Sequence, residues 1–146
     1  MLKTKKISQS ILKGYNKFFQ TFESLLSSFL LLGIRFWMAN IFFKSGRTKI
    51  SNMDNTVYLF EYEYDLPIFS PVFAAYLATF FELICPILLF LGLINRIATI
   101  PLIFMSLAIQ FLVIENIQHF YWIFLLSIIL VFGGGKLSLD RMLKIK

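Results

Sequence analysis

The chain has 146 residues, of which 58% are hydrophobic and only 15% are charged, and its formal net charge is +6. Soluble domains contain about 45–50% apolar and about 25% charged residues, so this chain, with its 18 phenylalanines, carries more apolar surface than a soluble domain of its length can bury. The composition therefore predicts an all-α membrane protein and leaves no room for a separate soluble domain.

Residues 1–23 are basic and amphipathic, and no small-residue cleavage site precedes the apolar run after them. Apolar residues recur at three- and four-residue steps between lysines, which is typical of a helix lying on an anionic inner leaflet. We expect this segment to anchor the first span; a disordered basic tail is the alternative. The apolar residues are Ile7, Ile11, Leu12, Tyr15, Phe18, Phe19 and Phe22.

Four apolar segments come next, and the fourth, which is the shortest, needs its flanks to cross a bilayer. A span needs roughly 20 mostly apolar residues, with a range of about 17–25. The pattern predicts spans at about 24–43, 71–93, 97–115 and 117–135, and a tail at 136–146. The predicted fold is a four-transmembrane-helix up-and-down bundle, in which the glycines at 133–135 cap the last helix.

The distribution of cations predicts the orientation of the bundle. The N-terminal segment, the loop with Arg96 and the C-terminal tail together carry ten lysines and arginines. The opposite side carries Lys44, Arg47 and Lys49, next to the end of the first span. Because short cytoplasmic segments are enriched in Lys and Arg, we expect both termini to be cytoplasmic. The three cations on the outer side are either functional or a chance excess.

Two ionisable residues, Arg35 and Glu82, lie near the middle of the first and second predicted spans. A charge at such a depth costs about 2.5–3.5 kcal/mol on insertion scales, so it usually faces the protein interior and finds a partner. With a rise of about 1.5 Å per residue, both side chains fall at similar depths in antiparallel helices. The sequence predicts an Arg35–Glu82 ion pair, which is either a structural lock or part of a functional polar site.

Further polar residues mark a possible route from the outer surface to this pair. Gln110 lies near the outer end of the third span, and His119 lies at the outer start of the fourth. With Lys44, Ser45 and Lys49 they form the predicted substrate-binding set. For His119 an interfacial position beside Tyr121 and Trp122 is the alternative, because aromatic residues favour the headgroup level.

The segment 44–70 is the longest stretch between predicted spans, and its second half alternates aromatic and acidic residues. Such a segment is expected to lie across the mouth of the bundle as a cap. Glu63 and Tyr64 are its candidate docking residues. The cap is either a gate or docking surface, or an interfacial helix that only tightens the fold.

The sequence is poor in groups for redox or metal chemistry. Cys85 is the one cysteine, so the chain cannot form an internal disulfide or a dithiol relay. His119 is the one histidine, and no cluster of His, Cys and carboxylates has the spacing of a metal site. We therefore predict no metal and no covalently bound cofactor.

Several motifs together make the chain resemble the DoxX family of bacterial membrane proteins over about residues 27–143. They are FFxSGxxK with Ser45, Gly46 and Lys49, EYxLP with Glu63, Tyr64 and Pro67, ATxxELxxP with Glu82 and Pro86, and a terminal LSLD. One departure lies at the outer end of the third span, where Ile114 and Glu115 replace a tyrosine–proline pair associated with the family.

The resemblance implies a four-helix bundle in the bacterial inner membrane. Some relatives resemble the quinone-reducing part of a thiosulfate:quinone oxidoreductase, and others associate with a superoxide dismutase and a sulfurtransferase. It thus implies a quinone-interacting subunit of an oxidoreductase assembly, with quinone as the possible cofactor. The possible partners are redox proteins, the bilayer and a second copy of the chain. No nucleic-acid partner is expected. The alternative is a non-catalytic membrane organiser or anchor, or a small-solute permeation protein.

Overall fold

The computed structural model describes residues 2–64 and 69–145, with side chains from Tyr15 onward. The described chain is helical and contains no strand, which confirms the predicted all-α class. Residues 65–68, which include Pro67 of the predicted cap, lie outside the described ranges. The helices are α1 (Leu2–Ser51), α2 (Met53–Leu59), the π-helix η1 (Phe60–Tyr64), α3 (Pro71–Leu91), α4 (Asn95–Leu112), α5 (Ile117–Phe132) and α6 (Leu139–Met142).

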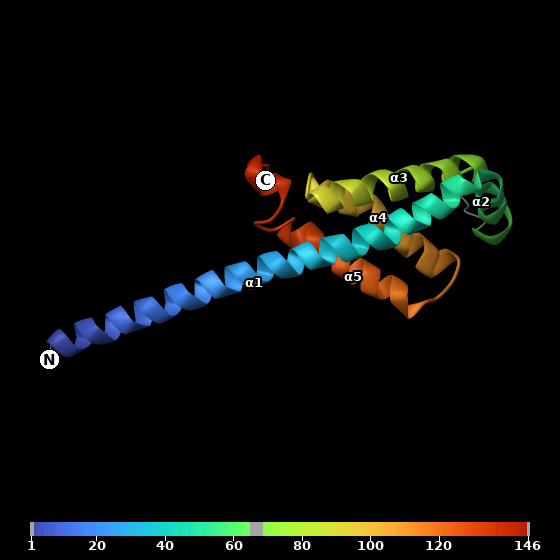
Figure 1. Ribbon diagram of the computed structural model, residues 1–146. Coiled ribbons are helices and arrows are strands. Elements are labelled where there is room, and N and C mark those ends of the chain that lie inside the picture. The colour runs from blue at the N-terminus through green and yellow to red at the C-terminus, as the bar shows by residue number, and fades with distance from the viewer. Residues whose placement is uncertain (1, 65–68, 146) are drawn as a thin grey trace.

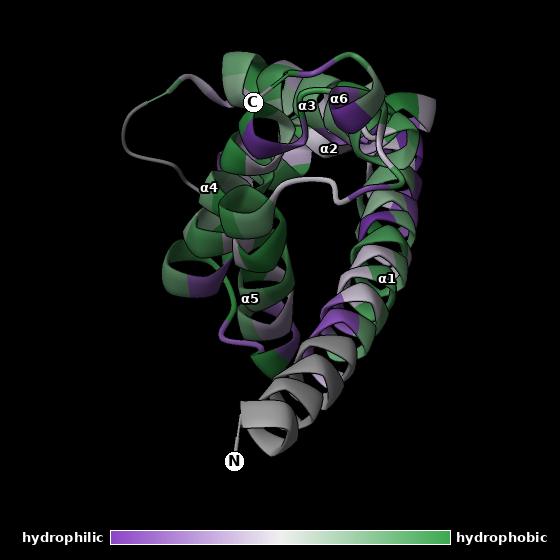
Figure 2. Cartoon of the chain, turned by 90° about the vertical axis from the view of Figure 1, so that its left-hand side faces the viewer, coloured by the Kyte–Doolittle hydropathy of each residue, from purple (hydrophilic) through white to green (hydrophobic). Residues whose placement is uncertain are grey.

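Three helices in the described part of the chain are long and apolar enough to cross a membrane. They are the Tyr15–Ser51 part of α1, α3 and α4, whereas α5 is apolar but has only 16 residues. Large hydrophobic side chains cover the outside of these helices, and the hydropathy colouring of Figure 2 shows that hydrophobic residues predominate along α3, α4 and α5. The structure therefore supports a helical membrane protein, as the composition predicts.

The helices pack around one long apolar core. Figure 1 shows α1 running along α3, with α4 and α5 forming a hairpin against the same region. The C-terminal part of α1 contributes Met38, Ala39 and Phe42 to this core, which also includes Cys85, Leu89, Ala98, Leu102, Leu126 and Ile129 from the other helices. Because the core uses all four long helices, the positions of polar residues in α1 are fixed relative to α3.

The helix that contains the first predicted span continues beyond the predicted outer end of the span. The sequence pattern placed its outer end at residue 43, because cations come after Phe43, but α1 continues to Ser51. Only Asn52 separates α1 from α2, and its side chain accepts a hydrogen bond from the backbone N–H of Asn55 and so caps α2. The expected outer loop is thus largely helical, and Lys44, Ser45 and Lys49 belong to α1.

At its other end, α1 begins at Leu2 and has no break near residue 23. The division of residues 1–23 from the first span therefore stays a prediction, and its side chains up to residue 14 lie outside the described part of the chain. The C-terminal end of α5 agrees with the sequence: the helix ends at Phe132, and Gly133 comes next as its cap with a φ of 75°. Glycine adopts this positive φ without steric cost.

Gly46 sets the closest approach of α1 to α3. A Cβ atom at this position would lie 2.9 Å from the backbone carbonyl carbon and oxygen of Glu82, closer than packed atoms tolerate. The two helices are antiparallel, so this contact places Gly46 opposite Glu82 and fixes the register of the pair. Gly33, on the outward face of the same helix, has no such neighbour within 4 Å.

We predict that Gly46→Val destabilises the protein by about 1–3 kcal/mol, because overpacking forces the two backbones apart. Gly33→Ala is the matched control and should leave stability unchanged or slightly raised, since alanine favours helix. Thermal unfolding in mild detergent measures both effects. Equal melting temperatures for Gly46→Val and Gly33→Ala would contradict the close approach.

Candidate functional site

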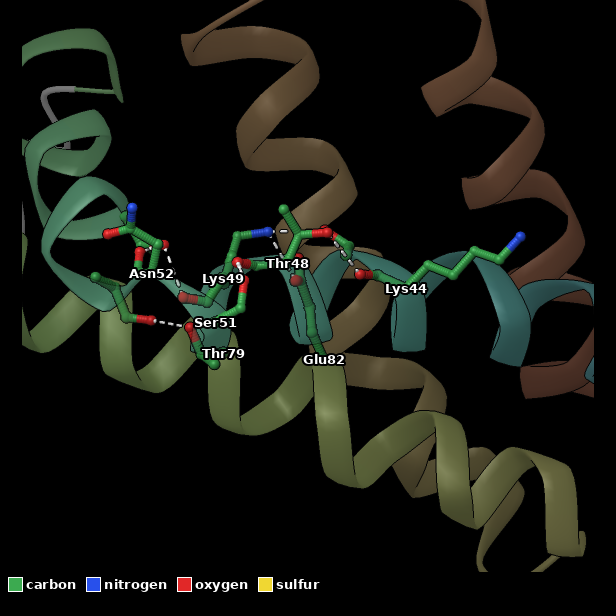
Figure 3. Close-up of polar contacts among 10 residues, drawn as sticks. Lys44, Thr48, Lys49, Ser51, Asn52, Thr79 and Glu82 are labelled. Carbon is green, nitrogen blue, oxygen red and sulfur yellow. Dashed lines mark hydrogen bonds and ion pairs between the residues drawn. The ribbon is translucent and has the colours of Figure 1, made fainter.

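A buried ion pair connects α1 and α3. The Lys49 Nζ atom lies 2.7 Å from the Glu82 Oε2 atom, and the Lys49 and Glu82 side chains are 16% and 4% exposed. Lys49 also donates a hydrogen bond to the Ser45 hydroxyl, at 2.8 Å. Figure 3 shows the Lys49 and Glu82 side chains pointing toward each other, whereas the Lys44 side chain points away.

The local sequence explains how this pair forms. Ser45 and Lys49 are four residues apart on one helix, so their side chains lie on the same face. Pro86 has no N–H group to donate to the backbone carbonyl of Glu82, and this is the carbonyl that Gly46 approaches. The glycine thus allows the main chain of α3 to come close enough for the Lys49 amine to reach the carboxylate.

Tyr64 brings a third ionisable group to the same region. It is the last residue of η1, and its ring packs edge-on against Phe60 with the ring centres 4.7 Å apart. Burial raises the pKa of the Tyr64 phenol above its usual value, and the carboxylates of Glu82 and Glu63 raise it further. Tyr64 is therefore a neutral hydrogen-bond donor throughout the physiological pH range.

Lys49, Glu82 and Tyr64 contribute to the wall of a cavity of about 640 Å³ between α3 and α4. The rest of the wall is almost entirely apolar, and it includes Phe60, Leu77, Phe81, Cys85, Pro101 and Met105. Cavities that bind small molecules are often of this kind, apolar with a few convergent polar groups. The arrangement can hold a molecule with a large apolar part and a polar group at the ion pair.

Arg35 does not pair with Glu82, so the predicted ion pair is wrong. Its guanidinium, 1% exposed, instead donates hydrogen bonds to four backbone carbonyls. They are those of Leu89 (2.9 Å), Gly134 (2.8 Å), Leu137 (3.1 Å) and Phe90 (3.1 Å). The last carbonyls of a helix have no partner within it, so Arg35 caps α3 and ties this end to the turn after α5.

The register of α1 and α3 explains the error. Gly46 lies opposite Glu82, and Arg35 is eleven residues earlier on α1, roughly 16 Å along the helix axis. The prediction ended α1 at residue 43 and therefore placed Arg35 too close to the outer end. The cation at the level of Glu82 is Lys49, which lies beyond the predicted span.

A family model for DoxX matches residues 30–115, more than half of the chain. The chain belongs to the DoxX family. This confirms the resemblance inferred from the sequence motifs, and the matched region contains Arg35, Lys49 and Glu82. No curated protein matches the chain, and no solved structure matches it.

The other predicted site residues of this DoxX protein do not join the ion pair. Gln110 and His119 lie together at the turn between α4 and α5, where the Gln110 Oε1 atom is 3.1 Å from His119 Nδ1 and accepts a hydrogen bond from the backbone N–H of Asn116. Lys44 and Glu63 are exposed. The structure thus brings Ser45, Lys49, Glu82 and Tyr64 together and separates Gln110 and His119 from them.

Sequence reasoning missed the role of Asp140. Its carboxylate accepts hydrogen bonds from the backbone N–H groups of Ile94 (2.6 Å) and Asn95 (3.0 Å) and from the Asn95 side-chain amide (2.8 Å). An acidic group at a helix N-terminus satisfies free N–H groups and complements the helix dipole. Asp140 belongs to the LSLD motif, which was the available signal, but the motif alone does not identify α4 as its partner.

We predict that Arg35→Met destabilises the DoxX protein by about 3 kcal/mol or more, because it leaves several buried carbonyls without a donor. Arg96→Met is the matched control: Arg96 also donates to a carbonyl, that of Val131 at 3.2 Å, but this contact is exposed. Thermal unfolding in detergent compares the two variants. A similar, small loss in both would show that Arg35 is not an essential cap.

We also predict that Glu82→Gln lowers the pKa of Tyr64 toward its usual value without restoring it fully, since burial is the larger cause of the upward shift. Ultraviolet absorbance against pH measures this, with a Tyr64→Phe variant in each background to isolate the signal of this phenol. Glu115→Gln, at the exposed turn before α5, is the control and should leave the titration unchanged. An unaltered Tyr64 titration in Glu82→Gln would contradict the proposed proximity.

Proposed function

We propose that this DoxX protein is the quinone-interacting membrane subunit of an oxidoreductase assembly in sulfur or oxidative-stress redox metabolism. The observation that carries the proposal is the apolar cavity between α3 and α4 with the Lys49–Glu82 pair in its wall. A quinone has a long apolar tail and a flat head group with two carbonyl oxygens. The cavity offers apolar walls for the tail and polar groups for the head.

The chemistry of the polar groups matches that of a quinone head. The Lys49 ammonium and the Tyr64 phenol are both donors, and quinone carbonyls are acceptors. Reduction of a quinone to a quinol takes two electrons and two protons. In the proposed site Lys49 or Tyr64 donates to a carbonyl, and the Glu82 carboxylate relays protons from the outer side. The electrons come from a partner protein.

The entrance to the cavity also suits a ligand dissolved in the membrane. Several lining residues on α3 and α4 are large, apolar and exposed, among them Phe80, Ile97 and Phe104, at 56%, 64% and 67%. These side chains would contact lipid in a bilayer. A lipid-soluble molecule therefore has a route into the cavity that avoids water.

The proposed topology places all four long helices across the bacterial inner membrane, with both termini in the cytoplasm. The excess of cations in the N-terminal segment, at Arg96 and in the tail supports this orientation. The α5 helix, with 16 residues, spans with the help of its flanking residues.

The ion pair also supports a second candidate function. Because Lys49–Glu82 joins α1 to α3, it has the geometry of a structural lock, as expected in a non-catalytic organiser, anchor or small-solute permeation protein. The two functions predict different results when the pair is broken. A lock variant loses folded protein, whereas a ligand-site variant stays folded and loses its ligand.

The test is mass spectrometry of lipids extracted from the protein purified in mild detergent from its native membrane. We expect wild type to contain quinone in near-stoichiometric amount, and Lys49→Met and Glu82→Gln to lose it while remaining folded. Lys44→Met is the matched control, because Lys44 is on the same helix but exposed and directed away from the pair, and it should keep the quinone.

Absence of quinone from well-folded wild type would overturn the redox proposal and favour the organiser or permeation function. Equal quinone in all four proteins would place the ligand elsewhere. Loss of folded protein in Lys49→Met and Glu82→Gln, with Lys44→Met intact, would identify the pair as a lock.

A further inference from the structure

The α1 helix is far longer than the helices it packs against. Its Tyr15–Ser51 part alone has 37 residues, whereas α3 has 21 and α4 has 18. At about 1.5 Å per residue these correspond to roughly 55 Å, 31 Å and 27 Å. A hydrocarbon layer is about 30 Å thick, so α3 and α4 match a membrane and α1 exceeds it.

The excess length lies at the N-terminal side of α1. At the other side, Gly46 packs against Glu82 in the middle of α3, and the Thr56 hydroxyl after the end of α1 donates to the carbonyl of Lys49. Arg35 already reaches the last carbonyls of α3. Figure 1 shows the N-terminal half of α1 extending beyond the other helices.

Tilting does not remove the excess. Transmembrane helices tilt by about 20° on average and up to about 40°, and a helix of about 55 Å at this limit still spans roughly 42 Å along the membrane normal. Ser28 and Leu31 pack on the turn after α5, because a Cβ atom at Gly135 would lie 3.1 Å from Leu31 Cδ1 and 3.6 Å from Ser28 Cα. The residues before Ser28 therefore need an environment of their own.

These residues form a two-faced helix. One stripe consists of large apolar side chains that are all at least 47% exposed. The opposite stripe is polar and includes Lys17, Gln20 and Ser24. The apolar stripe is exposed along its length, and only its C-terminal end, at Leu26, Phe29 and Leu30, shares a shallow hollow with Leu125 of α5. Before Ser28 it consists of Tyr15, Phe18, Phe19, Phe22, Leu25 and Leu26, and Phe29 and Leu30 continue it along the helix.

We propose that the N-terminal part of α1 is a membrane-surface arm, which bends away from the bundle at Ser24–Ser28 and lies on the anionic cytoplasmic leaflet. Bending in this direction turns the apolar stripe toward the lipid and the polar stripe toward water. The proposal is independent of quinone binding.

The sequence at the bend and the charge of the arm support this. The hydroxyls of Ser27 and Ser28 both donate to the carbonyl of Ser24, at 3.2 Å and 2.7 Å, and such hydrogen bonds to the preceding turn often accompany helix bends. The first 17 residues contain five lysines, and Glu23 is the one acid among the first 23. A basic amphipathic helix of this composition is attracted to anionic lipid.

The test uses spin labels on the full chain, reconstituted in vesicles of phosphatidylcholine with phosphatidylglycerol. In a Cys85→Ala background, Phe19→Cys and Phe22→Cys label the apolar stripe, and Lys17→Cys and Gln20→Cys label the polar one. Phe104→Cys, 67% exposed on α4, provides the reference for lipid contact. The rate at which each spin label collides with oxygen reports its contact with lipid. The rate at which it collides with a water-soluble nickel complex reports its contact with water.

We expect the collision rates to alternate with the helical period. The labels at Phe19 and Phe22 should have the same collision rates as the label at Phe104. The labels at Lys17 and Gln20 should collide several-fold more often with the nickel complex. The contrast should shrink in vesicles of phosphatidylcholine alone. High nickel collision at all four positions would overturn the proposal in favour of a straight helix in water. If the labels at Phe19 and Phe22 are shielded from both reagents and show dipolar coupling to each other, the apolar stripe contacts a second copy of the chain and not lipid. This result would overturn the proposal. Equal contrast in both vesicles would overturn the role of anionic lipid.

Discussion

The close approach of α1 and α3 at Gly46 is the constraint on which the polar interior depends. Without a side chain at this position, the α3 backbone at Glu82 comes close enough for Lys49 to reach the carboxylate. The same register brings Arg35 to the last carbonyls of α3. In a membrane, polar groups must find partners inside the protein because no water is available. The register at this contact thus matches the positions at which the buried Arg35 and the partly buried Lys49 find their partners.

The two cations have different partners, and the difference results from their chemistry. Arginine has five N–H donors in a planar group and stays charged, so it suits the four fixed backbone carbonyls at the end of α3. Lysine is a compact charge on a flexible chain, and Lys49 divides its donors between Glu82 and Ser45. The arginine contact is therefore suited to a permanent cap, whereas the lysine contact is suited to the exchange of partners that the proposed ligand requires.

The sequence predicted the class, the family and most helix boundaries, but not the partners of the buried charges. The lengths of the apolar runs predicted the ends of α3, α4 and α5 to within a few residues, because a helix that contacts lipid along its length needs an apolar run of the same length. The partners depend on register, and the apolar pattern of α1 does not reveal that the helix continues through Lys44 and Arg47 to Ser51. The acceptors of Arg35 could not be found from the sequence at all, because every residue has a backbone carbonyl.

The segment predicted to lie across the mouth of the bundle contributes to the wall around the candidate site. Thr56 ties α2 to the end of α1 through the carbonyl of Lys49, and Phe60 packs on Ala74 and Ala75 of α3. These contacts hold η1 in place, so that Tyr64 lies in the wall of the cavity. A ligand that reaches Lys49 and Glu82 therefore does not need to pass through this segment from the water. For the quinone proposed above, the exposed apolar rim between α3 and α4 is the more direct entrance, because its side chains are large, apolar and exposed.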